Sequence, residues 1–165
     1  MSEWLLTWRA DPRLAALADR HYSRRTPGAS QFAPPGRVVC LVSDDGDAGW
    51  VSWQTDYPDA DWLRDAWCCT LFRNEGSVLS SALITEAVAA TRALWGEQPP
   101  PGGMVTTVDP VKVRRKRDPG RCFLKAGFHR LPQLTKDRGL VILKLNPDDF
   151  PASELPGHAQ LKLAA

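Results

Sequence analysis

Short apolar runs bounded by Gly, Pro and Asp recur along the first 145 residues, and they predict strands. The run Ala48–Gln54 alternates apolar and polar positions, which is typical of a strand with one buried face. In contrast, Ala66–Phe72 is apolar on both faces, which indicates a central strand. The expected strands are Trp4–Arg9, Arg37–Ser43, Ala48–Gln54, Ala66–Phe72, Met104–Val108, a strand opening at Phe128, and Gly139–Leu145.

Three segments carry helix signals. Asp11 followed by Pro12 predicts an N-cap and a first helical residue, and the apolar face that follows ends at His21. The longest helix is expected over Ser77–Trp95, where Leu79, Leu83, Ala87, Ala90 and Leu94 recur at helical spacing and Gly96 ends the pattern. A short helix is expected from Asp118 to Ala126.

The order of these elements predicts the fold class. A strand, the long helix and a second strand form a unit that needs a right-handed crossover, so part of the sheet is parallel. The other neighbouring strands are close enough in sequence to form hairpins. We therefore expect a single α/β domain over residues 1–145, with a mixed sheet of about six to seven strands flanked by helices. Residues 146–165 contain Pro and Asp, and we expect a loose C-terminal tail.

Composition narrows the class of protein. The chain has 165 residues, of which 43% are hydrophobic and 24% charged, as in ordinary globular domains. No apolar run approaches the length of about 18 residues that spans a membrane, so no membrane association is expected. The N-terminus lacks the pattern of a signal peptide. The four cysteines (Cys40, Cys68, Cys69 and Cys122) show no metal-ligand spacing, and we expect them reduced in a cytoplasmic protein.

Charge is unevenly distributed behind a net value of +2. Residues 112–138 contain ten Lys or Arg and two Asp, whereas residues 44–65 contain seven Asp and one Arg. This division favours a basic face directed at a polyanion. A solvated loop in an arginine-rich sequence explains the same composition equally well, and both interpretations stay open at this point.

Several local motifs resemble a known family. The segment Asp118-Pro-Gly-Arg-Cys-Phe-Leu-Lys-Ala-Gly-Phe128 resembles the late helix of the GNAT (Gcn5-related N-acetyltransferase) fold. Three blocks, His21-Tyr-Ser-Arg24, Phe72-Arg-Asn-Glu75 with Ser80-Ser81, and Val108-Asp-Pro-Val-Lys-Val113, are similar to a phage and bacterial GNAT-like group that includes Mom-type DNA modification proteins. This resemblance covers about residues 3–145. It implies a transferase, encoded by a phage or a bacterium, that modifies adenine in DNA.

The chain departs from ordinary acetyltransferases at the start of the long helix. Their pyrophosphate loop follows the pattern Gln/Arg-x-x-Gly-x-Gly/Ala, and here Arg73 and Gly76 match it whereas Val78 does not. Glu75 would also repel phosphate. The usual Tyr on the late helix is missing, because the chain's tyrosines are Tyr22 and Tyr57. Acetyl-CoA is therefore a less favoured donor than another acyl-type donor.

The candidate catalytic residues are His21, Tyr22 and Asp109. His21 could also be an ordinary core histidine, and Asp109 could simply cap the turn at Pro110. Asp109 follows a central strand, where α/β sheets bind ligands, and it could accept the proton of an amine. The resemblance further implies iron, for which His21 and Asp109 are the candidate ligands.

Residues expected to bind substrate or donor surround these positions. They are Ser23, Arg24, Arg73, Asn74, Gly76, Ser77 and Ser80. Asn74 could instead be only the N-cap of the long helix, and the serines could serve helix–sheet packing. The basic run before the short helix is expected to hold DNA phosphates. Its members are Lys112, Arg114, Arg115, Lys116, Arg117 and Arg121.

Three functions follow from these features. The first is a GNAT-like transferase that modifies a base amine in DNA after the base is flipped out of the helix. The second is an acetyl-CoA-dependent N-acetyltransferase of a small amine or a protein. The third is a non-catalytic DNA-binding module.

Overall fold

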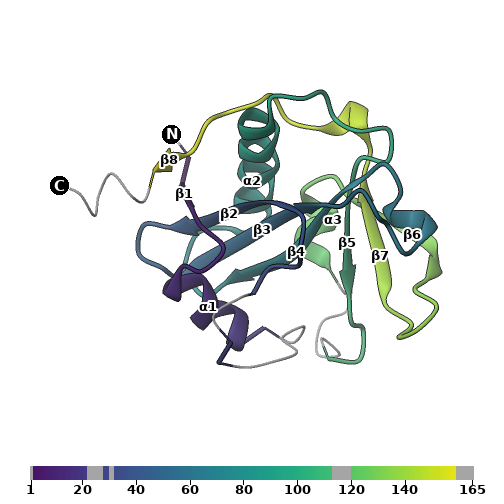
Figure 1. Cartoon of the computed structure of the whole chain (residues 1–165), viewed down its shortest axis with the longest axis horizontal. Helices are drawn as coiled ribbons and strands as arrows, with labels where there is room; N and C mark the ends of the chain where they lie inside the picture. Colours follow the sequence, from purple (N-terminus) through teal and green to yellow (C-terminus); the bar gives the residue numbers. More distant parts are fainter. Residues whose placement is uncertain (1, 22–27, 30–31, 113–119, 159–165) are drawn as a thin grey trace.

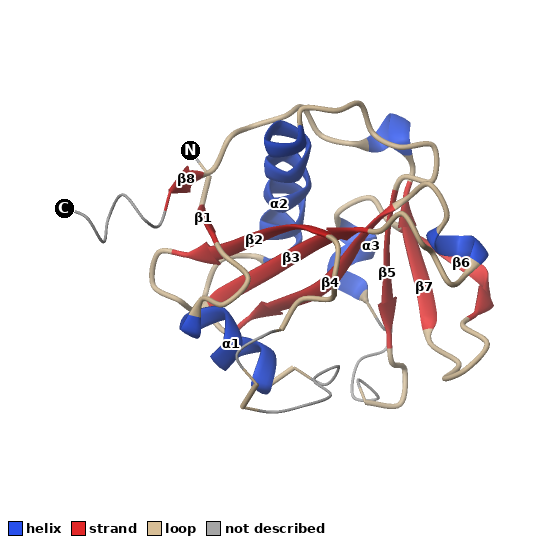
Figure 2. Cartoon of the chain, viewed as in Figure 1, coloured by secondary structure: helices blue, strands red, loops and turns tan. Residues whose placement is uncertain are grey.

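The computed structural model describes residues 2–21, 28–29, 32–112 and 120–158. Within these residues one sheet is covered by helix α1 on one face and by helices α2 and α3 on the other (Figures 1 and 2). The helices are α1 Pro12–Asp19, α2 Ser80–Trp95 and α3 Arg121–Lys125, with short 3-10 turns at Asp61–Leu63 and Pro147–Asp149. The strands are β1 Trp4–Thr7, β2 Arg37–Ser43, β3 Ala48–Gln54, β4 Trp67–Asn74, β5 Met104–Val108, β6 His129–Leu134, β7 Val141–Leu145 and β8 Gly157–His158.

The sheet confirms the expected mixed α/β fold. Its strand order in the described residues is β6-β7-β5-β4-β3-β2-β1-β8. Strands β4 and β5, joined through α2, are parallel, as are β1 and β8, whereas the other neighbours pair antiparallel. The strand beyond the expected six to seven is β8, which has two residues and lies in the segment assigned to the tail.

Helix α1 begins as its sequence predicts. Asp11 accepts a hydrogen bond from the backbone N–H of Arg13 at 2.8 Å, and the Thr7 hydroxyl donates to the same carboxylate at 2.6 Å. The helix buries Leu14 and Leu17 against β3 at Gly49. A Cβ at Gly49 would collide with the Leu14 side chain, so only glycine allows this close helix–sheet contact.

Helix α2 begins at Ser80, three residues later than predicted. Asn74 explains the difference because its side-chain amide donates to the Val78 carbonyl at 2.7 Å and to the Ser80 hydroxyl at 3.0 Å. These bonds hold residues 75–79 in a loop, since a local side-chain bond competes with helix formation. Asn74 is the last residue of β4 and not the N-cap, which is Leu79. The helix ends as expected at Gly96, whose φ is 62°.

The core lies on both faces of the sheet. Cys69 belongs to the larger cluster beneath α2 and α3, while Cys68 belongs to a small cluster on the other face, so the two side chains point to opposite faces as predicted. The four cysteines are free thiols. Among the described residues, no helix has the length and apolar character to cross a membrane.

The segment after β7 corrects an expectation. Residues 146–158 are held on the domain at Phe150 and at Gly157–His158, in contrast to the predicted loose tail, and the remaining residues of that tail, 159–165, lie outside the described residues. Phe150 is buried, and its ring lies 5.8 Å from that of Trp67. Leu5 and Leu6 of β1 pair with Gly157 and His158. The prediction failed because one aromatic anchor and two strand residues are too short a pattern to detect by periodicity.

Candidate functional site

The sheet opens between its two central parallel strands. Strands β4 and β5 pair only at Trp67 with Met104 and at Cys68 with Val105. Beyond these residues the strands diverge toward their carboxyl ends (Figure 1). At the point of divergence, the Thr106 hydroxyl donates to the Cys69 carbonyl at 2.9 Å, so a side chain takes the place of a backbone donor. The carboxyl half of β4 therefore has no strand partner on its β5 side among the described residues.

A β-bulge lies at the same point of β4. The pairing with β3 runs from Val51–Leu71 to Ser52–Cys69 and omits Thr70. The Thr70 hydroxyl oxygen is buried and has no hydrogen-bond partner within the described part of the chain. Buried polar groups are nearly always paired, so such an atom marks a place where a bound molecule could supply the missing partner. Bulges are also frequent next to active sites.

The carboxyl end of β4 carries a charged cluster on the α1 face. Arg73 donates to the Arg20 carbonyl at 2.8 Å and to the Glu75 carboxylate at 2.6 Å. Arg20 forms two further bonds to Glu75, at 2.7 and 2.8 Å. Glu75 therefore holds two arginines at the end of α1, beside His21. Paired in this way, its carboxylate does not present the unscreened negative charge that the sequence suggested.

Two pKa values in this cluster are displaced. Burial, and then the positive charge of Arg73, lower the pKa of His21 from 6.5 to about 4. His21 is therefore a neutral imidazole at physiological pH. Hydrogen bonds from Arg20 and then Arg73 lower the pKa of Glu75 to about 2, so this residue stays ionised.

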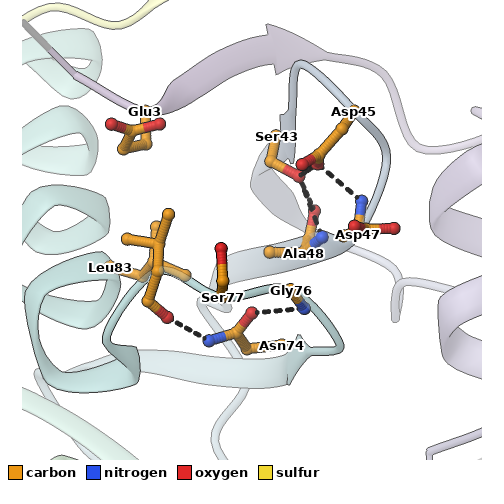
Figure 3. A pocket seen from close by; sticks show the side chains of 10 residues that line it. Glu3, Ser43, Asp45, Asp47, Ala48, Asn74, Gly76, Ser77 and Leu83 are labelled. Atoms are coloured by element: carbon orange, nitrogen blue, oxygen red, sulfur yellow. Dashed lines mark hydrogen bonds between the residues drawn. The ribbon is translucent and has the colours of Figure 1, made fainter.

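The opposite face of β4 holds a different group of predicted residues. Asn74 accepts the backbone N–H of Gly76 at 3.0 Å, and both residues line a shallow pocket together with Ser77 (Figure 3). The Asn74 amide also donates to the hydroxyl of Ser80, which is not part of the lining. The pocket has a cavity volume of about 30 Å³, enough for about one water molecule. Its ionisable lining residues in the described chain are Glu3, Asp45 and Asp47. Three carboxylates make this pocket a poor site for phosphate.

Asp109 lies one residue beyond β5. Its carboxylate accepts the backbone N–H groups of Val111 at 2.9 Å and of Lys112 at 3.2 Å. The side chain thus caps the turn after the strand, which is the simpler of the two roles expected for it. Asp109 follows the end of β5, whereas Arg73 lies near the end of β4, and these two strands are no longer paired at those ends.

Part of the predicted site lies outside the described residues. These positions are Tyr22, Ser23, Arg24, Arg114, Arg115, Lys116 and Arg117. Of the basic run, Lys112 and Arg121 are described, and both are exposed. In the described chain, no three His, Cys, Asp or Glu side chains gather as metal ligands. The expected iron at His21 and Asp109 stays a prediction.

The structure thus divides the predicted residues into two groups. It brings His21 and Arg73 together on the α1 face, and it brings Asn74, Gly76, Ser77 and Ser80 together on the α2 face. Sequence reasoning missed Thr70 because a bulge leaves no mark in the residue pattern. Arg20 was missed as well, although its position directly before His21 was a signal.

Comparison with known proteins does not assign the chain to a family. No protein-family model matches the chain, and no curated protein matches it.

Proposed function

We propose that the protein is a transferase, similar in fold to GNAT enzymes, that moves an acyl-type group from a donor to a base amine in DNA. The observation that carries the proposal is the opening between β4 and β5. An extended donor with amide groups can bond to the unpaired edge of β4 as an added strand would. The Thr70 hydroxyl at the start of this edge is a further hydrogen-bonding group for that donor.

The reaction needs a base for the amine. Attack of the amine nitrogen on the donor's carbonyl carbon forms the new N–C bond, and the bond to the leaving group breaks with its electron pair. The nitrogen loses a proton in this step. His21 is neutral and lies beside the carboxyl end of β4, so it can accept that proton. The positive charge of Arg73 disfavours the imidazolium form of His21, so Arg73 favours the release of this proton from His21 afterwards.

DNA is proposed as the acceptor because one segment of the chain is strongly basic. Residues 112–138 carry ten Lys or Arg against two Asp, and phosphate contacts supply most of the non-specific affinity for DNA. A flipped base would then enter the end of the sheet where β4 and β5 diverge.

Mass spectrometry of nucleosides tests the proposal. DNA from cells expressing the protein should contain a base of increased mass, and DNA from cells expressing His21→Gln should lack it. Unmodified DNA in both cases would contradict the transferase and favour the non-catalytic DNA-binding module.

Asp109 has a matched pair of variants. Asp109→Asn keeps an oxygen that can accept the N–H groups of Val111 and Lys112 but loses the charge, whereas Asp109→Ala loses both. If the carboxylate takes part in the reaction, both variants lose modification. If only Asp109→Ala loses it, the side chain serves the turn alone.

An acetyl-CoA-dependent acetyltransferase is the second candidate, favoured by two observations. The Glu75 carboxylate, expected to repel phosphate, is neutralised by Arg20 and Arg73. Val78 also precedes the helix and does not lie within its first turn. Micromolar affinity for acetyl-CoA, measured by calorimetry, would favour this candidate. The acidic pocket beside Asn74 leads us to expect much weaker binding.

A further inference from the structure

Two groups of described cations differ in their partners. Up to residue 92, each described arginine is held by an oxygen acceptor of the protein. These residues are Arg9, Arg13, Arg20, Arg37, Arg64, Arg73 and Arg92. From residue 125 onward, five cations form no ion pair with the described part of the chain: Lys125, Arg130, Lys136, Arg138 and Lys144. We call these five residues the β6 edge surface.

Arg130 of the β6 edge surface lies in β6, and Lys136 and Arg138 lie in the hairpin that follows it. Lys125 ends helix α3, just before β6, and Lys144 lies in the neighbouring strand β7. Strand β6 is the last strand beside β7, at the end of the sheet opposite β8 (Figure 1). Arg130 pairs with Leu143, whose side chain is buried beneath α2 and α3, so Arg130 lies on that face. Lys144 is the neighbour of Leu143 in β7 and lies on the other face. Arg130 and Lys144 therefore place their charges on opposite faces of this end of the sheet.

The hairpin between β6 and β7 adds two cations at one end of this edge. Lys136 and Arg138 are exposed on either side of Asp137. The Asp137 carboxylate accepts the backbone N–H of Arg138 at 3.0 Å. It makes no ion pair among the described residues, so neither neighbouring cation is neutralised by direct contact.

The backbone of β6 does not suit an added peptide strand. Pro132 has no N–H group, which breaks the row of donors along the edge. The pairing with β7 is also irregular between Arg130 and Leu134. A partner would therefore be held by side-chain charge more than by backbone pairing. A chain of phosphates meets this requirement, because Lys and Arg bind phosphates without a regular strand partner.

We propose that the β6 edge surface binds the phosphate backbone of DNA. The choice of DNA as the polyanion rests on the proposed function. The surface contacts the duplex away from the reacting base and adds affinity that does not depend on sequence. Unpaired cations fit this role because each contact with a phosphate releases a counterion from the DNA. An arginine that already pairs with a carboxylate gains less binding free energy from such a contact.

Fluorescence anisotropy of a labelled DNA duplex tests the surface with the full chain. The test variant is Lys136→Gln/Arg138→Gln. The matched control is Arg37→Gln/Arg64→Gln, which removes the same net charge from arginines that form ion pairs. We expect the slope of log affinity against log salt to fall by about 2 in the test variant and by less than about 0.5 in the control. Between about 50 and 200 mM salt, the wild type should lose about tenfold more affinity than the test variant.

The alternatives give different results. An unchanged slope in the test variant, or an equal fall in both variants, would overturn the proposal. Wild-type protein that binds polyglutamate of equal charge as tightly as DNA would overturn it in favour of an acidic protein partner.

Base modification is read separately by nucleoside mass spectrometry. DNA binding that depends on Lys136 and Arg138, without modified bases, would support the surface and contradict the transferase. Modified bases, together with DNA binding that does not depend on Lys136 and Arg138, would support the transferase and contradict the proposed surface.

Discussion

The neutral state of His21 has a measurable consequence for stability. Its pKa is lowered from 6.5 to about 4 in the folded protein, first by burial and then by the charge of Arg73. Between these two values the unfolded chain binds more protons than the folded chain, so the free energy of unfolding rises with pH. The stabilisation is complete above pH 6.5 and is lost as the pH falls toward 4.

The size of the effect follows from the two pKa values. The complete change amounts to at most about 3 kcal/mol, and about 2 kcal/mol of it falls between pH 5 and pH 7. Acidic groups such as Glu75, whose pKa is about 2, lose their contribution at lower pH. Burial raises the pKa of Glu86, so the comparison with His21→Gln, and not the pH window alone, assigns the change between pH 5 and pH 7 to His21.

Two measurements check this prediction. NMR of the imidazole protons should show His21 titrating near pH 4. Urea unfolding at pH 5 and pH 7 should show the pH dependence in the wild type and its loss in His21→Gln. Arg73→Gln should raise the pKa of His21, whereas Arg73→Lys, which keeps the charge, should raise it less. A titration of His21 near pH 6.5, or equal pH dependence in wild type and His21→Gln, would refute the reasoning.

Three further substitutions test the packing and the opening. Thr70→Val removes the unpartnered hydroxyl, so it should stabilise the protein by about 1 kcal/mol in urea unfolding while weakening donor binding; a clear destabilisation would mean that the hydroxyl has a partner. Gly49→Ala should cost about 1–3 kcal/mol, because its Cβ meets Leu14, and a neutral result in thermal unfolding would show that α1 can shift. Phe150→Ala should cost about 3 kcal/mol by the same assay, and a neutral result would mean that residues 146–158 are not anchored to the core.

The fold was predictable where local signals agree with each other. Asp11-Pro12 fixes the start of α1, Gly96 fixes the end of α2, and the boundaries of β2, β3 and β5 match their apolar runs. The start of α2 was not predictable, because the apolar spacing continues through Leu79 while Asn74 holds the backbone in a loop.

The site was less predictable than the fold. Residue type and order placed His21 on the apolar face of the first helix, but α1 ends at Asp19 and His21 lies two residues beyond it, half-buried. They also could not show which face of the sheet each residue of the segment Arg73–Gly76 would occupy. The bulge at Thr70 changes the alternation within β4, and only the pairing with β3 shows it. The sequence likewise gave no sign that β4 and β5 separate after two paired residues.

The short parallel pairing of β8 with β1 matters beyond the fold of one molecule. Without it, β1 would present a row of unsatisfied amide and carbonyl groups to solvent, a template on which another chain could assemble. In this protein Gly157 and His158 pair with that edge of β1. Shortened forms that stop before Gly157 should therefore self-associate at concentrations where the whole protein stays dispersed.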